Sequence, residues 1–264
     1  MTTDKIFPPC DMRHATGPFD LIGDVHGCAG ELEALLEKLG YVVDHAGPAT
    51  LRSYSISHPQ NRRLIFLGDL VDRGPRSPDV LRLVQSVVEA GTGFCVLGNH
   101  DFKLFRWLKG SNVQLTHGLD ETVLQFQLQP TGFAEDVQTF LESLPTHLVL
   151  EQGELVVAHA GLTENFHNTS SGKERSFALF GDTNGERDVY GLPIRLDWAV
   201  HYSGAAHVIY GHMAVTEALW VNKTICLDTG CVFGGRLTAL KWPERELVSV
   251  EAFKTYYESM PPRF

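Results

Sequence analysis

The chain has 264 residues, enough for one sizeable hydrophobic core, and 43% of them are apolar. Its net charge of −10 excludes a broadly basic surface, so we expect no extended nucleic-acid binding track. No apolar run approaches the roughly 18 residues of a membrane span, and we expect no membrane partner. Five cysteines without close pairing and the lack of a secretory signal favour a reduced, cytoplasmic protein.

The first candidate site follows a short strand near the N-terminus. Residues 1–18 are polar and contain proline, and we expect a loosely held N-terminal arm. Apolar residues 19–22 then predict a strand that ends in the motif GDVHG. Asp24 and His26 in that motif are two residues apart on an extended strand end, so they project to one side and suit one metal ion. A plain strand-to-helix turn is the alternative for so short a motif.

A second buried strand leads into the motif GDLVDRG. Leucines at helical spacing predict a helix that ends at Gly40, and residues 41–61 predict a polar hairpin before this strand. Charged residues at the end of a buried strand are costly unless they hold something. Asp69 could bridge two metal ions, Asp72 could orient a catalytic group, and Arg73 could bind an anion.

A third apolar strand, residues 94–97, leads into the motif GNHD. Asn99 offers a neutral carbonyl oxygen to a metal, and His100 can donate a proton near neutral pH. The alternative for Asn99 is a cap on the following helix. We expect residues 102–145 to form a small helical insertion over the site.

Two more strands end in histidine. Residues 147–158 show a hairpin pattern that ends at His159, and residues 207–210 lead to His212. Between them, residues 162–205 are rich in glycine, serine, threonine and charge, and we expect a long substrate lid. The remaining strands carry the chain past Asp228 and complete one domain over residues 19–252, with residues 253–264 as a C-terminal tail.

Five apolar strands therefore each end in a residue type that binds metals. Loops at the ends of parallel strands gather at one edge of an α/β sheet. A lone histidine is more often structural, but the repetition beside glycine favours a common site. Mixed carboxylate, carboxamide and imidazole ligands suit Mn, Fe, Zn, Co or Ni, and one bridging carboxylate would hold two such ions.

The ordered motifs GDVHG, GDLVDRG, GNHD, HAG and GH span residues 23–212 and resemble those of the calcineurin-like metallophosphoesterases. Within that family the chain resembles two bacterial branches. One is the phosphatase module of polynucleotide kinase-phosphatases, and the other is the asymmetrical bis(5′-nucleosyl)-tetraphosphatases. The chain has no GxxxxGK[ST] phosphate-binding loop, so it lacks the kinase part of the first branch.

The resemblance implies a fold and a ligand set. The fold is α/β, with two stacked mixed β-sheets flanked by helices in an α/β/β/α sandwich and an active site at the strand ends. One implied metal is bound by Asp24, His26 and Asp69. The other is bound by Asp69, Asn99, His159 and His212.

The resemblance also implies catalytic roles. His100, steadied by Asp72, is the expected acid for the leaving group, and Arg73 grips phosphate together with Asn99 and His100. Asp228 matches a family acid that we expect to support the metal ligands.

A second phosphate-binding arginine is expected in the lid. Arg195 is the first choice and Arg175 the second, and an ordinary surface charge is the alternative for both. The protein-phosphatase branch has Glu where this chain has Asp101, which makes a protein substrate less expected.

The implied reaction is phosphoester hydrolysis by direct attack of a metal-bridging hydroxide, with manganese as the expected metal. We expect phosphorylated nucleotides or nucleic-acid ends as substrates, and the sequence identifies no stable protein partner. Three alternatives stay open: bis(5′-nucleosyl)-tetraphosphatase, serine/threonine protein phosphatase, and a catalytically silent metal-binding scaffold.

Overall fold

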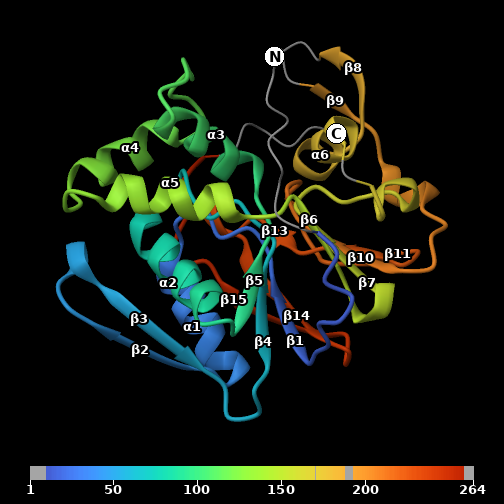
Figure 1. Cartoon of the computed structure of the whole chain (residues 1–264), viewed down its shortest axis with the longest axis horizontal. Helices are drawn as coiled ribbons and strands as arrows, with labels where there is room; N and C mark the ends of the chain where they lie inside the picture. Colours follow the sequence, from blue (N-terminus) through green and yellow to red (C-terminus); the bar gives the residue numbers. More distant parts are fainter. Residues whose placement is uncertain (1–9, 170, 188–192, 259–264) are drawn as a thin grey trace.

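Two mixed β-sheets form the centre of the molecule (Figure 1). The fold is taken from a computed structural model, which describes residues 10–169, 171–187 and 193–258. The first sheet has the order β13 (Asp228–Thr229), β14 (Arg236–Trp242), β1 (Phe19–Ile22), β4 (Arg63–Phe66) and β5 (Gly93–Cys95), with β15 (Glu246–Glu251) also paired to β14. The second sheet has the order β11 (Trp220–Val221), β12 (Thr224–Cys226), β10 (His207–Tyr210), β7 (Leu155–Ala158) and β6 (His147–Leu150).

Strand direction decides where the loops meet. In the first sheet β1, β4 and β5 are parallel, while β14 runs antiparallel to β1. In the second sheet β7, β10 and β12 are parallel, and β6 and β11 pair antiparallel at the edges. The C-terminal ends of parallel strands lie at one edge of a sheet, so each sheet presents its polar motifs together.

The alternation of side chains along the strands builds the core between the sheets. Phe19 and Leu21 of β1, and Ile65 of β4, point into this layer. Their strand neighbours Ile22 and Phe66 point to the opposite, helix-covered face. Because successive side chains on a strand alternate between faces, one buried strand can serve two cores.

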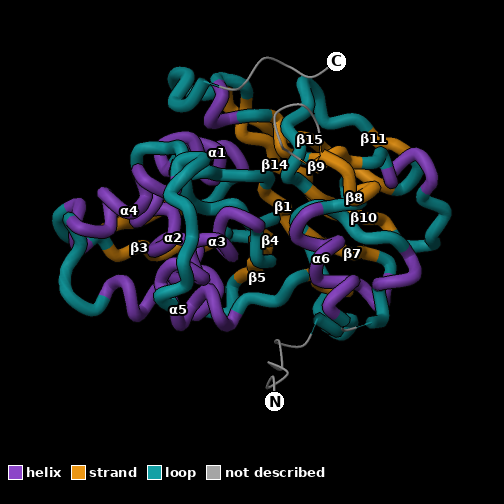
Figure 2. Tube along the Cα trace, turned by 90° about the horizontal axis from the view of Figure 1, so that it is seen from above, coloured by secondary structure: helices purple, strands orange, loops and turns teal. Residues whose placement is uncertain are grey.

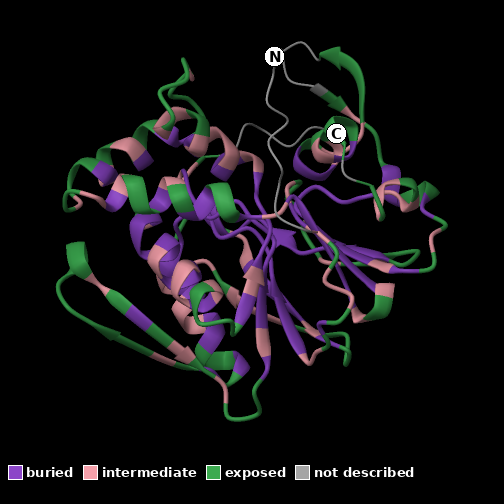
Figure 3. Cartoon of the chain, in the orientation of Figure 1, coloured by how far each residue is buried: buried purple, intermediate pink, exposed green. Residues whose placement is uncertain are grey.

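Helices cover both outer faces (Figures 1 and 2). Helices α1 (Ala29–Leu39) and α2 (Ser77–Glu89) pack against the first sheet. The outer face of the second sheet is covered by α6 (Gly172–Phe180) and the 3₁₀ segment Trp198–His201. Figure 3 shows buried residues concentrated in the strands between these helices. The layers confirm the predicted α/β/β/α sandwich.

A helical segment follows β5, and its role as an insertion over the site stays a prediction. It consists of α3 (Asn99–Leu108), α4 (Leu119–Gln127) and α5 (Phe133–Ser143), and it extends the side of the molecule that carries α1 and α2 (Figure 2). None of the described helices is long and apolar enough to cross a lipid bilayer.

Two hairpins lie outside the sandwich. The predicted hairpin over residues 41–61 is confirmed as β2 (Val42–Ala46) and β3 (Ser53–Ser57), and the lid contains β8 (Thr183–Arg187) and β9 (Pro193–Arg195). Short 3₁₀ segments connect the elements at Ala49–Leu51, Glu151–Gly153, Glu164–Phe166 and Cys231–Phe233.

The described part of the N-terminal arm is not loose. The Met12 N–H donates to the Val149 carbonyl over 2.9 Å, and the Val149 N–H donates to the Cys10 carbonyl over 2.9 Å. Ala15 is also buried. The sequence pattern missed this attachment because it depends on the edge strand β6. Residues 1–9 and 259–264 lie outside the described chain, and the domain limits stay predictions.

A buried ion pair fastens the end of β1 away from the metal-ligand loops. Arg62 donates through Nε to both Asp20 carboxylate oxygens over 3.0 and 2.9 Å, and the Asp20 side chain is fully buried. The Tyr41 hydroxyl donates to the same carboxylate over 2.8 Å. A second carboxylate, Glu244, accepts from Arg62 Nη1 over 2.8 Å. With all these groups paired, the charge at this position is tolerated.

We expect Arg62→Ala to lower the free energy of unfolding by about 3–5 kcal/mol, because it leaves the buried Asp20 carboxylate without its charged partner. Urea unfolding followed by circular dichroism measures the change. Lys241→Ala is the control, since Lys241 pairs with the exposed Glu246 and should cost less than about 1 kcal/mol. Equal losses in the two variants would contradict a special role for Arg62.

Candidate metal centre

The five predicted strand ends converge on one buried centre. Two groups of side chains there present potential metal-ligand atoms that all lie within 4.8 Å of one another. The first group is His26, Asp69 and His100, and the second is Asp69, His159 and His212. Asp69 belongs to both groups, as a bridging carboxylate would.

The backbone at this centre is unusual. Five non-glycine residues have positive φ angles: His26 at 44°, Asp69 at 48°, Asp72 at 74°, Arg73 at 70° and His212 at 75°. Each such conformation is disfavoured for a residue with a Cβ and persists only when the surrounding structure holds it. The surrounding fold therefore holds these residues in unfavourable backbone conformations, which direct their side chains toward the centre.

Two glycines allow the loops to approach one another closely. A Cβ added at Gly211 would lie 1.9 Å from Asp24 Oδ1, and one at Gly98 would lie 2.1 Å from the Asp69 amide nitrogen. Both positions therefore require glycine. The loops after β5 and β10 could not reach the centre with any other residue there.

Backbone carbonyls select the tautomers of two histidines. His26 Nδ1 lies 2.8 Å from the Val71 carbonyl oxygen, and His159 Nδ1 lies 2.9 Å from that of Leu67. A carbonyl only accepts, so each Nδ1 carries the hydrogen and each Nε2 keeps its lone pair. Metal-binding histidines are commonly held in this way.

Several potential ligand atoms then crowd around the Nε2 lone pair of His159. His159 Nε2 lies 2.9 Å from Asn99 Oδ1 and 3.0 Å from His212 Nδ1. It also lies 3.4 Å from Asp69 Oδ1. His212 Nε2 is buried and has no hydrogen-bond partner within the described ranges. Acceptor atoms packed this closely need a cation between them, so the donor set fits a divalent metal.

Burial and neighbouring charges shift the pKa values of the carboxylates at the centre. Burial and the charges of Asp228 and Asp69 raise the pKa of Asp24 well above its ordinary value. Burial raises the pKa of Asp228 to about 6, with a further contribution from Asp69. Burial also acts to raise the pKa of Asp69, but the surrounding histidines, His159 foremost, lower it overall. Asp69 is therefore the carboxylate that stays ionised.

Two histidines of the centre, His26 and His212, are kept neutral. Burial, followed by the charge of Arg73, lowers the pKa of His26 well below its ordinary value. Burial, followed by the charges of His159 and Arg195, does the same for His212. Neutral imidazole is the form that binds a metal, so these ligands need to lose no proton near pH 7.

Asp72 orients His100 as expected. His100 Nδ1–H donates to Asp72 Oδ2 over 2.6 Å, and this leaves Nε2 facing the centre. The Thr122 hydroxyl donates to the other Asp72 oxygen over 2.7 Å, and the Asp72 N–H donates back to Thr122 Oγ1 over 3.0 Å. The sequence analysis did not identify Thr122, which α4 of the helical insertion supplies.

Arg73 lies between the two sides of the site. It donates through Nη1 to His26 Nε2 over 2.8 Å and through Nη2 to His100 Nε2 over 2.9 Å. Its guanidinium also faces the rings of Phe233 and Tyr257, at 5.1 and 5.8 Å from their centroids. Cation–π contacts of this kind hold the arginine in place. Tyr257 lies in the segment expected to be only a tail, and no local motif indicated its contact.

Asp24 lies beside the second group of ligands. Its two oxygens accept from the His212 N–H over 3.2 and 3.0 Å. The structure thus brings Asp24 to the centre, although the first group contains His100 in its place. Its expected role as a ligand stays a prediction, as does the supporting role of Asp228.

The two lid arginines are separated by the fold. The charge of Arg195 reaches both His159 and His212, where it lowers the pKa of each imidazole after larger effects of burial. Arg175 instead lines a cavity of about 330 Å³ with residues of α3 and α5, such as Phe105 and Leu141. Arg195 is therefore the lid arginine placed toward the centre.

Asp101 has a structural position. It is fully buried, and its two oxygens accept the N–H groups of Leu70 and Gly98 over 2.9 and 3.0 Å. It joins the loops after β4 and β5. This position explains an acid at residue 101 without reference to substrate, so Asp101 carries no weight against a protein substrate.

Known proteins are similar to this chain in sequence. The family model for calcineurin-like phosphoesterases matches residues 17–215. The chain is 43% identical over 242 residues to a bis(5′-nucleosyl)-tetraphosphatase PrpE (asymmetrical) of Anoxybacillus flavithermus, which covers 90% of this chain and 96% of that protein. It is 42% identical over 245 residues to the protein of the same name from Bacillus subtilis, covering 91% and 97%.

Solved structures agree with the fold. A crystal structure provisionally named a diadenosine tetraphosphatase is 28% identical, with a TM-score of 0.66 and coverage of 94% of this chain and 99% of that one. A serine/threonine phosphatase from Saccharomyces cerevisiae, at 17% identity and a TM-score of 0.55 over 97% and 86%, shares the fold alone. The ordered motifs, the sandwich and the family match together show that the chain belongs to the calcineurin-like phosphoesterase family.

Proposed function

We propose that the chain is a two-metal phosphohydrolase that acts on nucleotides, with the metals held on either side of Asp69. The observation that supports this most is the convergence of lone pairs around Asp69, since the carboxylate is shared by both ligand groups. We assign one metal to Asp24, His26 and Asp69. We assign the other to Asp69, Asn99, His159 and His212.

When bound, two divalent ions supply an activated water and offset the charge of the phosphoryl oxygens. Residues of the chain supply the phosphate contacts and the proton for the leaving group. Arg73 grips an equatorial phosphoryl oxygen, and Arg195 meets the phosphate from the lid. Asn99 and His100 complete the phosphate contacts. His100, held by Asp72, gives a proton from Nε2 to the departing oxygen.

We propose manganese as the metal, with iron, zinc, cobalt and nickel as alternatives. Three of the assigned ligands are imidazoles, and magnesium prefers all-oxygen sites. A silent metal-binding scaffold is less well supported. It gives no physical reason for Arg73, His100 and Asp72 to be assembled beside the metal ligands.

The similarity to proteins named bis(5′-nucleosyl)-tetraphosphatase favours a dinucleoside tetraphosphate as substrate. A terminal phosphate of a nucleotide or of a nucleic-acid end could bind to the same metals and to Arg73, so it is the second candidate. The net charge of −10 argues against a polymer bound along its length.

We expect chelator-treated protein to lose phosphohydrolase activity and to regain it with Mn, Co or Ni more than with Mg. Asp69→Asn should lower the metal content, because it weakens the ligand shared by both groups. Elemental analysis and an aryl phosphate assay measure the two effects. His201→Ala, at an exposed position outside the centre, is the control. Full activity in verified metal-free protein would exclude the two-metal site.

We expect His100→Ala to slow hydrolysis of alkyl phosphates by about 10²–10⁴-fold, because the leaving alkoxide then lacks its proton donor. Hydrolysis of 4-nitrophenyl phosphate should fall much less, since its leaving group needs no proton. Metal content should be compared in both proteins. Equal slowing of both substrates with retained metal would show that His100 is not the acid.

We expect kcat/KM for a 3′-phosphorylated oligonucleotide to change little as the chain is lengthened, and to depend weakly on salt. The metals and Arg73 would bind the terminal phosphate, and few counterions would be displaced elsewhere. Steady-state assays over several lengths and salt concentrations test this. Diadenosine tetraphosphate, a 2′,3′-cyclic nucleotide and a phosphopeptide in the same assay rank the substrate classes. A steep rise with length that collapses in salt would indicate a basic track.

A further inference from the structure

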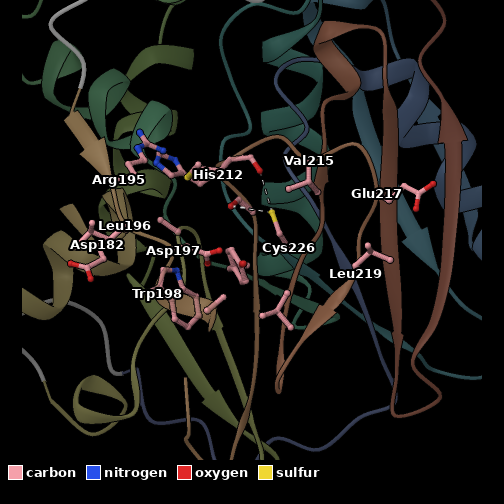
Figure 4. Close-up of a pocket in the computed structure, with 17 residues that line it drawn as sticks. Asp182, Arg195, Leu196, Asp197, Trp198, His212, Val215, Glu217, Leu219 and Cys226 are labelled. Atoms are coloured by element: carbon pink, nitrogen blue, oxygen red, sulfur yellow. Dashed lines mark hydrogen bonds between the residues drawn. The ribbon is translucent and has the colours of Figure 1, made fainter. Parts of the chain in front are cut away.

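A cavity of about 390 Å³ opens beside the metal centre (Figure 4). Its wall includes Ala160, Gly211 and His212, so the loops that carry the ligands His159 and His212 also bound the cavity. The volume falls in the range of pockets that bind small molecules. A substrate held at the metals could therefore extend into it directly.

Most of the lining is apolar. It includes two aromatic rings, Trp198 and Tyr210, and a set of aliphatic side chains: Leu196, Met213, Val215, Leu219 and Val221. Met213 and Leu219 are 51% and 65% exposed. Apolar side chains left open to water beside a polar centre indicate a surface that an apolar part of a ligand covers.

The aromatic wall is held firmly. The Trp198 ring packs 5.0 Å from that of Tyr210 and 5.9 Å from that of Phe177. A Cβ at Gly161, which has φ of 93°, would lie 1.9 Å from the Trp198 ring. Glycine at residue 161 therefore makes room for the indole, and the wall is formed before any ligand arrives.

The cavity is lined by one arginine and three carboxylates. Arg195 lies at the end nearest the metal centre, close to His212, while Glu217 and Leu219 lie away from it (Figure 4). Two further carboxylates, Asp182 and Asp197, line the wall. Phosphate is attracted to the arginine end and repelled by the three acids. An uncharged ring that carries amino hydrogens suits the rest of the cavity, because the carboxylates there can accept hydrogen bonds from it.

We propose that this cavity binds one nucleoside of a dinucleoside polyphosphate, with its base against the apolar wall and its phosphate chain running past Arg195 to the metals. The inference rests on the proposed function and names its substrate class. A nucleic-acid end fits less well, because the phosphate after the first nucleoside would meet the carboxylates of Asp182, Asp197 and Glu217.

A larger side chain at the open side of the cavity should block ligand binding there. Leu219→Trp should raise KM for diadenosine tetraphosphate by about tenfold or more, with little change in kcat, because the larger indole would occupy space that the base needs. Its kcat/KM for 4-nitrophenyl phosphate should stay unchanged, because that substrate contacts only the metals and the phosphate-binding residues such as Arg73. Leu247→Trp, at an exposed leucine on β15, is the matched control.

Calorimetry with adenosine supplies a readout that needs no turnover. Adenosine should bind the wild type and the Leu247→Trp variant, and binding should weaken at least tenfold in Leu219→Trp. Absence of adenosine binding to the wild type would overturn the proposal, as would unchanged binding and unchanged KM in Leu219→Trp. A KM increase for a 3′-phosphorylated oligonucleotide alone would assign the cavity to a polymer and also overturn it.

The two proposals fail in different ways. A wild type with bound metal that hydrolyses neither substrate would overturn the proposed function, while adenosine calorimetry would still report on the cavity. A wild type that hydrolyses 4-nitrophenyl phosphate but not diadenosine tetraphosphate would keep the metal chemistry and overturn the assignment of the cavity to this substrate class.

Discussion

The structure depends on the crowding of acceptor atoms around Asp69. The Asp69 carboxylate, the Asn99 carbonyl oxygen and the ring nitrogens of His159 and His212 lie close together in a buried space. Such an arrangement is unfavourable in a dry interior unless positive charge offsets it. The surrounding features, from the left-handed backbone at His26 to the required glycine at residue 211, hold these atoms together against their repulsion.

The two sheets supply the rigidity that this crowding demands. Each ligand follows a strand whose side chains enter a core on both faces, so its backbone cannot relax away from the centre. The helical insertion adds a further restraint through the Thr122 hydroxyl, which fixes Asp72 and thereby His100. Precise placement of catalytic groups on rigid elements is what phosphoryl transfer requires, because positioning and electrostatics carry most of the rate.

The segment expected to be a lid supplies two neighbouring features. It places the charge of Arg195 near His159 and His212 and contributes Trp198 to the apolar wall of the cavity, and both residues belong to the same short stretch of chain. Family members share the metal centre, so selectivity among phosphorylated compounds has to come from such neighbouring surfaces. One arginine and three carboxylates line the cavity, and such charges influence the orientation of a ligand that carries phosphate at one end.

The sequence by itself determined the layers and indicated which residues could be ligands. Short apolar runs and glycine-flanked Asp, Asn and His motifs are local patterns, and strand ends of parallel sheets meet by topology. Contacts between distant segments were decided only in the folded chain. These include the backbone hydrogen bonds between β6 and residues 10–12, and the hydrogen bond between Thr122 and Asp72. They also include the packing of the Phe233 and Tyr257 rings against the Arg73 guanidinium, and the different locations of Arg195 and Arg175. No local spacing encodes them, because each depends on where tertiary packing places a helix, a lid or a terminal segment.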